Sequence, residues 1–176
     1  EKPTNITVTT ESYNQLLVSW DPVADAEGYR VYRSTTRNGN YELAGVVDEP
    51  ETELLDEDLR ANINYNNKVE ALAEGGEIVG PAGGPVRGKT DKFQAPENLR
   101  AEALGPDTIL VQWDPVDYAE GYLLYRSTSR FGTYDPIGDI TDTEFEDTDR
   151  QPNTLYYYKV ASYEGDNQAL AGPVYA

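Results

Sequence analysis

Two stretches of this chain repeat one another, and together they decide its fold. Residues 16–35 read LLVSWDPVADAEGYRVYRST, and residues 109–128 read ILVQWDPVDYAEGYLLYRST. The two tryptophans lie 113 − 20 = 93 residues apart, and the same offset joins the Glu-Gly-Tyr and Tyr-Arg-Ser-Thr runs of the copies. A repeat of this length indicates two homologous modules. We therefore expect two domains, covering residues 1–91 and 92–176.

Each copy carries the pattern of β-strands separated by turns. In the first copy Leu16, Val18 and Trp20 alternate with other residues, and the second copy follows the same rhythm. A period of two is typical of strands with one buried face. The Asp-Pro that follows each tryptophan ends the strand, because proline has no amide hydrogen to donate to a ladder. No window shows helical periodicity with caps, so the chain is predicted to be all-β.

The pattern resembles that of the fibronectin type III domain, which has a core tryptophan, a Tyr-x-Val strand after it, and a leucine six residues before a core tyrosine. The resemblance covers essentially the whole chain and implies two tandem immunoglobulin-like (fibronectin type III) β-sandwiches. Arg150 replaces the leucine in the second repeat, and we expect that corner to be slightly looser. The core residues it implies are Trp20, Tyr29, Val31, Leu59, Tyr65, Trp113, Tyr122, Leu124 and Tyr156.

The end of the second repeat differs from that of the first. The second repeat stops soon after Gly172-Pro173, whereas the first continues from Gly80-Pro81 through Thr90. We therefore expect the last strand of the chain to be short. The connection between the repeats contains no Gly/Ser run, which predicts limited bending between them.

The composition argues against catalysis. The chain has no His, Cys or Met, so it can assemble neither a Ser-His-Asp nor a Cys-His arrangement, nor a Cys/His zinc site. Gly75-Gly76 and Gly83-Gly84 are interpreted as loop residues, because no glycine-rich loop here follows a strand and opens a helix. Carboxylate catalysis is the one enzymatic alternative, but Asp and Glu are expected at turns and on outward strand positions. We predict no catalytic, cofactor-binding or metal-binding residue.

Two features leave a binding role open. The acidic clusters Asp56-Glu57-Asp58 and Asp147-Asp149 could offer oxygen ligands to calcium, although they lack the spacing of a dedicated loop, and solvated connections are favoured. Four tyrosines are predicted on an outer face, where they could stack on a sugar ring or anchor a protein. The favoured interpretation is a pair of cross-strand aromatic contacts that stabilise the sheet. These candidate residues are Tyr32, Tyr41, Tyr125 and Tyr134.

Charge and resemblance together predict the setting of the protein. The net charge of −18 repels nucleic acid and anionic lipid and favours a monomer, and no stretch approaches the ~18 apolar residues of a membrane span. The Tyr-Arg-Ser-Thr run is similar to versions in bacterial secreted and surface proteins, which implies a bacterial, extracellular parent. We expect a non-catalytic spacer whose partners are the neighbouring domains of a larger protein. The alternative is an adhesion module that binds a glycan or surface protein through the tyrosines or the end loops.

Overall fold

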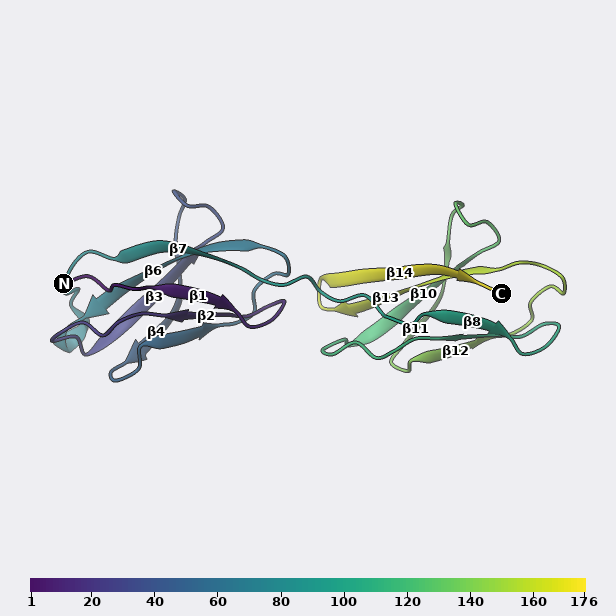
Figure 1. Cartoon of the computed structure of the whole chain (residues 1–176), viewed down its shortest axis with the longest axis horizontal. Helices are drawn as coiled ribbons and strands as arrows, with labels where there is room; N and C mark the ends of the chain where they lie inside the picture. Colours follow the sequence, from purple (N-terminus) through teal and green to yellow (C-terminus); the bar gives the residue numbers. More distant parts are fainter. The chain divides into compact units, whose positions relative to one another are not determined.

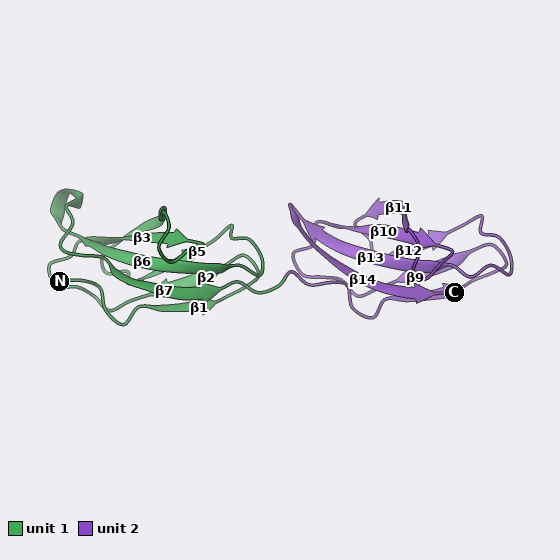
Figure 2. Cartoon of the chain, turned by 90° about the horizontal axis from the view of Figure 1, so that it is seen from above, with its two compact units in different colours: residues 1–92 green, residues 93–176 purple.

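The computed structural model describes all 176 residues, and they form fourteen strands in four sheets. The chain divides into two compact units, the first unit over Glu1–Lys92 and the second unit over Phe93–Ala176 (Figures 1 and 2). This division falls one residue after the boundary expected from the sequence. Each unit is a sandwich of a three-stranded and a four-stranded sheet, and all strand pairs are antiparallel.

The first unit pairs its strands in the orders β1-β2-β5 and β4-β3-β6-β7 (Figure 1). A single 3-10 turn over Glu74–Gly76 is the only helical segment. The strands are β1 (Thr7–Thr10), β2 (Leu16–Ser19), β3 (Gly28–Ser34), β4 (Glu42–Asp48), β5 (Glu53–Asp56), β6 (Asn64–Leu72) and β7 (Gly83–Lys89). Gly83 and Gly84 therefore open a strand, and their assignment to a loop was wrong.

The second unit repeats this topology in the orders β12-β9-β8 and β11-β10-β13-β14. Its strands are β8 (Arg100–Ala103), β9 (Ile109–Gln112), β10 (Gly121–Ser127), β11 (Asp135–Ile140), β12 (Glu144–Asp147), β13 (Tyr157–Glu164) and β14 (Asn167–Tyr175). The expectation of a short last strand was wrong, because β14 has nine residues. Gly172 and Gly84 each lie opposite a register shift of the neighbouring strand, and both have a positive φ, 100° for Gly172 and 90° for Gly84. Gly172-Pro173 of the second unit therefore corresponds to Gly84-Pro85 of the first.

A tryptophan and a tyrosine form the centre of each core. In the first unit the rings of Trp20 and Tyr29 are 5.1 Å apart, and the Tyr29 hydroxyl accepts a hydrogen bond from the Val23 amide at 2.8 Å. In the second unit Trp113 and Tyr122 lie 5.3 Å apart in the same arrangement. All nine residues expected in the core are buried, namely Trp20, Tyr29, Val31, Leu59, Tyr65, Trp113, Tyr122, Leu124 and Tyr156.

The first and last strands of the first unit run side by side in the same direction. The Gly83 backbone approaches the Pro3 carbonyl, and the Gly88 backbone approaches the Val8 side chain, each too closely to leave room for a Cβ atom. Residue numbers thus rise together along β1 and β7. The chain consequently enters this unit at one end and leaves it at the other (Figure 1).

Candidate functional site

Two of the four candidate tyrosines lie around one lysine on the outer face of the first unit. Tyr32 on β3 is directly opposite Lys68 on β6, and the Lys68 Nζ lies 4.0 Å from the centre of the Tyr41 ring. Tyr32 donates its hydroxyl to Glu70 at 2.9 Å, and Tyr41 donates to the Arg37 carbonyl at 2.8 Å. Both tyrosine side chains are half-buried. The Lys68 ammonium also covers the face of the Tyr41 ring on which a ligand would have to stack.

The second unit builds the same arrangement around Lys159. Tyr125 on β10 is paired with Lys159 on β13, and the Lys159 Nζ lies 4.1 Å from the centre of the Tyr134 ring. Tyr134 donates its hydroxyl to the Arg130 carbonyl at 3.0 Å. The structure therefore brings the four tyrosines together as two lysine-centred pairs, one in each unit. A cation over a tyrosine ring stabilises the sheet by about 0.5–1 kcal/mol at exposed sites.

Burial raises the pKa of three of these phenols. It acts on Tyr32, Tyr41 and Tyr134, and the hydrogen bond to Glu70 raises the pKa of Tyr32 in the same direction. Electrostatic repulsion between Tyr134 and the neighbouring Tyr157 phenol also raises the pKa of Tyr134. The three hydroxyls therefore stay protonated at neutral pH and act as hydrogen-bond donors.

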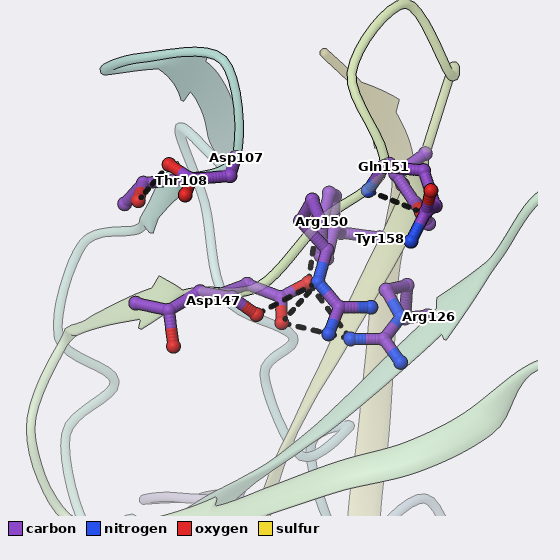
Figure 3. Close-up of polar contacts among 9 residues, drawn as sticks. Asp107, Thr108, Arg126, Asp147, Arg150, Gln151 and Tyr158 are labelled. Carbon is purple, nitrogen blue, oxygen red and sulfur yellow. Dashed lines mark hydrogen bonds and ion pairs between the residues drawn. The ribbon is translucent and has the colours of Figure 1, made fainter.

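Behind these faces, each unit buries one aspartate next to an arginine. In the second unit Asp147 accepts hydrogen bonds from Arg126 at 2.7 and 3.0 Å, and the Nε of Arg150 lies 3.2 Å from the same carboxylate (Figure 3). Tyr158 donates its hydroxyl to the second oxygen at 2.7 Å. Burial raises the pKa of Tyr158 far above its usual range, and the bond to Asp147 adds to this. Arg150 thus fills the corner where a leucine was expected, pairing with Asp147 and stacking 5.5 Å from the ring of Tyr156.

The first unit satisfies its aspartate less completely. Asp56 is paired with Arg33, and burial raises the pKa of Asp56 although Arg33 pulls it in the opposite direction. Asn67 stands where the second unit has Tyr158, and its side-chain amide is buried without a hydrogen-bond partner, as is one oxygen of Asp56.

These buried ion pairs bear on the calcium alternative. The expectation that acidic side chains sit only at turns and outward positions was wrong for Asp56 and Asp147, because arginines from the neighbouring sheet neutralise them inside the sandwich. No group of three or more acidic side chains is placed to hold a metal ion.

Sequence reasoning missed a further aromatic pair on the outer face of the second unit. The rings of Tyr157 on β13 and Tyr175 on β14 lie 5.9 Å apart, and Tyr175 is 63% exposed. The first unit has Asn66 and Arg87 paired at the equivalent place. The alternation that placed Tyr125 outward would also have placed Tyr157 outward, since Tyr156 and Tyr158 on either side of it are buried.

Comparison with known proteins identifies the fold. Residues 1–86 match the family model of the fibronectin type III domain. Mouse Protein sidekick-1 is 35% identical over 126 residues, which are 65% of this chain and 6% of that protein. Chicken receptor-type tyrosine-protein phosphatase eta is 30% identical over 171 residues, which are 95% of this chain and 12% of that protein. A solved two-fibronectin-type-III-domain segment from chicken tenascin matches 99% of this chain and 97% of its own, with a TM-score of 0.52 and 17% identity.

These matches confirm the predicted all-β fold of two tandem fibronectin type III sandwiches. They do not support the expected bacterial source, because these relatives are animal proteins. The chain spans about an eighth or less of the length of either relative named here. No helix of the structure has the length and apolar character needed to cross a membrane.

Proposed function

Starting from the fold of two tandem fibronectin type III β-sandwiches, we propose that this chain is an extracellular, non-catalytic spacer within a larger protein. A receptor-type phosphatase and a sidekick protein among its relatives support a place in a longer, multidomain chain. Two of the candidate tyrosines support the structural role as well, because Lys68 and Lys159 lie over the rings of Tyr41 and Tyr134, whose hydroxyls bond nearby backbone carbonyls.

The parallel course of β1 and β7 is the observation that carries this proposal. Because the chain enters and leaves the first unit at opposite ends, the unit separates whatever precedes it from whatever follows it. The seven residues of β7 alone extend about 23 Å at the usual rise of a strand. A domain whose termini met at one end would add bulk but no such separation.

A distance measurement between engineered cysteines tests the spacer directly. The chain contains no cysteine, so Glu1→Cys with Ala176→Cys can be labelled at both ends for single-molecule energy transfer. The control is Lys2→Cys with Lys92→Cys, which spans the first unit alone. A spacer gives an end-to-end distribution nearly as narrow as the control. A distribution several times broader would show two freely moving units and contradict the proposal.

The second candidate function is adhesion through the outer face of the second unit, and the exposed Tyr157–Tyr175 pair favours it. Two adjoining rings offer a stacking platform to a sugar or to an aromatic side chain of a protein. The test is retention of the chain on immobilised polysaccharides and surface proteins, compared with a Tyr157→Ala, Tyr175→Ala variant. Retention that the variant loses while its melting temperature is kept would establish adhesion.

The matched control is the Tyr32→Ala, Tyr41→Ala variant of the first unit, which lacks an exposed aromatic pair. Equal loss of retention in both variants would contradict a binding site confined to the Tyr157–Tyr175 pair. Absence of retention for the unmodified chain would reject adhesion to the materials tried.

A further inference from the structure

One triplet of the chain has the form Asn-x-Ser/Thr, namely Asn5-Ile6-Thr7. Such a triplet is the acceptor for N-linked glycosylation on surface segments of secreted proteins, provided that its middle residue is not proline. No other asparagine of the chain is followed by serine or threonine two positions later. Because the triplet is short, its place in the fold decides whether it can carry a sugar.

Asn5 lies on the surface just before β1, between two residues that are held in place. Asn5 and Thr7 are exposed, whereas Ile6 packs against the core of the first unit. On the other side of Asn5, the Thr4 carbonyl accepts a hydrogen bond from the Asp21 amide at 3.0 Å. A sugar on the Asn5 side chain would therefore project into solvent from a fixed point of the fold.

The side-chain amide of Asn5 has one hydrogen that the fold does not need. Its Nδ2 donates a hydrogen bond to the Asp21 carboxylate at 2.6 Å. A carboxamide nitrogen carries two hydrogens, and this bond uses one of them. Attachment of a sugar replaces the other hydrogen, so the contact between Asn5 and Asp21 can persist in the modified protein.

The second unit repeats this arrangement without the hydroxyl of the triplet. Asn98 is exposed, has a φ of 50° where Asn5 has 49°, and donates its amide to Asp114 at 2.7 Å. Two positions later stands Arg100, whose guanidinium donates to the Asn98 carbonyl at 3.3 Å. The local fold thus accounts for an asparagine in both units, but it does not require the hydroxyl of Thr7.

We propose that Asn5 is the attachment site of an N-linked oligosaccharide and that Asn98 is not. The proposal rests on the extracellular location proposed above, because the sugar donor and its transferase belong to the secretory pathway. The donor is an oligosaccharide joined to a lipid pyrophosphate. The Asn5 Nδ2 forms a bond to the anomeric carbon of the sugar and loses one proton, while the bond from that carbon to the phosphate oxygen breaks and the lipid pyrophosphate leaves.

Attachment of the sugar precedes folding of the first unit. In the folded unit the hydroxyls of Thr7 and Ser19 share a hydrogen bond at 2.7 Å, and the Asn5 amide is bonded to Asp21. The transferase therefore meets both groups free only in the unfolded chain. Loss of the Thr7–Ser19 bond should leave the modification unchanged, whereas loss of the Thr7 hydroxyl should abolish it.

The test is expression of the full chain behind a cleavable secretion leader in animal cells. Peptide-N-glycosidase treatment and mass spectrometry of the product then show whether and where a glycan is attached. We expect a single glycan, and its removal by the enzyme should leave aspartate in place of Asn5. Thr7→Ala should lose this glycan, while Thr7→Ser and the matched control Ser19→Ala should keep it.

Arg100→Thr is the matched variant of the second unit, because it completes an acceptor triplet at Asn98. It should add a second glycan, and a single glycan on this variant would overturn the claim that the residue at this position distinguishes the two units. A product without a glycan, or a glycan kept by Thr7→Ala, would overturn the site at Asn5. The leader takes the chain into the secretory pathway whatever its native location, so these outcomes concern the site alone, and the energy-transfer distances separately test the spacer.

Discussion

A single aromatic contact at the centre of each sandwich carries much of the stability of that unit. Trp20 is 5% exposed and packs on the fully buried Tyr29, so Trp20→Ala should destabilise the first unit by about 3–5 kcal/mol. Trp113 is then the only tryptophan, and its fluorescence should report unfolding of the second unit at an unchanged denaturant concentration. Amide exchange in β3 measures the loss in the first unit, and unaltered protection there would show that Trp20 is not a core residue.

Tyr158 makes the stability of the second unit depend on pH. Its pKa is raised in the folded state by burial and by the bond to Asp147, whereas in the unfolded chain it stays near ~10. The unfolded state therefore loses the proton first, and this contribution to stability is complete below about pH 10 and is lost as the pH rises further. Urea unfolding of the chain and of Tyr158→Phe, between about pH 8 and pH 11, measures the difference.

The Tyr158→Phe variant should remove the extra loss of stability at high pH. At neutral pH it should cost about 1.5–3 kcal/mol, because the buried Asp147 carboxylate loses one of the two donors to its Oδ2 and keeps only Arg126 there. Tyr134→Phe is the control at neutral pH, since its hydroxyl bonds an exposed carbonyl and its loss should cost far less. Equal costs for the two variants would argue against the buried cluster.

At this scale the sequence predicted which side chains are buried but not the partners they find inside. Alternation alone places Tyr29 and Val31 inward. It says nothing of the pairing between Arg126 and Asp147, because that contact joins strands of different sheets. Alternation also does not predict that the Tyr158 hydroxyl donates a hydrogen bond to Asp147. Partners across a sandwich depend on how two sheets are superimposed, which no local pattern records.

At the scale of single elements, Gly28 sets the spacing between β3 and β4. A Cβ atom there would lie 2.8 Å from the Val47 carbonyl oxygen, so Gly28→Ala should force the strands apart and cost about 1–3 kcal/mol. Gly105→Ala is the control, because nothing lies within 4 Å of a Cβ atom at that position. Thermal unfolding compares the two, and a neutral Gly28→Ala would show that β4 shifts freely.

The positions of strands were predicted well where apolar and polar residues alternate along the sequence. They were predicted poorly where pairing with a neighbouring strand determines how far a strand extends. The end of the chain was expected to form a short strand, yet β14 follows β13 from Asn167 to Tyr175. Its length comes from the ladder that β13 offers, and Gly172 accommodates the register shift with a positive φ. Gly83 and Gly84 join β7 for the same reason, although their composition favours a turn.

For the whole molecule, the dominant electrostatic quantity is the net charge of −18. Like charges destabilise a compact state, and salt screens them as the Debye length falls from about 30 Å at ~0.01 M to about 8 Å at ~0.15 M. Raising sodium chloride over this range should therefore increase the melting temperature by a few degrees, measured by calorimetry. Calcium chloride at matched ionic strength should add nothing further, and a large additional increase would revive a calcium site.

The parallel course of β1 and β7 has a mechanical meaning as well. Tension applied to the two ends of the first unit pulls along the axes of both strands, so it loads the contacts at Pro3–Gly83 and Val8–Gly88 together in shear. Strands pulled apart from one end would instead peel open contact by contact at a much lower force. A unit threaded in this way is suited to bear a stretching load between the parts of a longer chain.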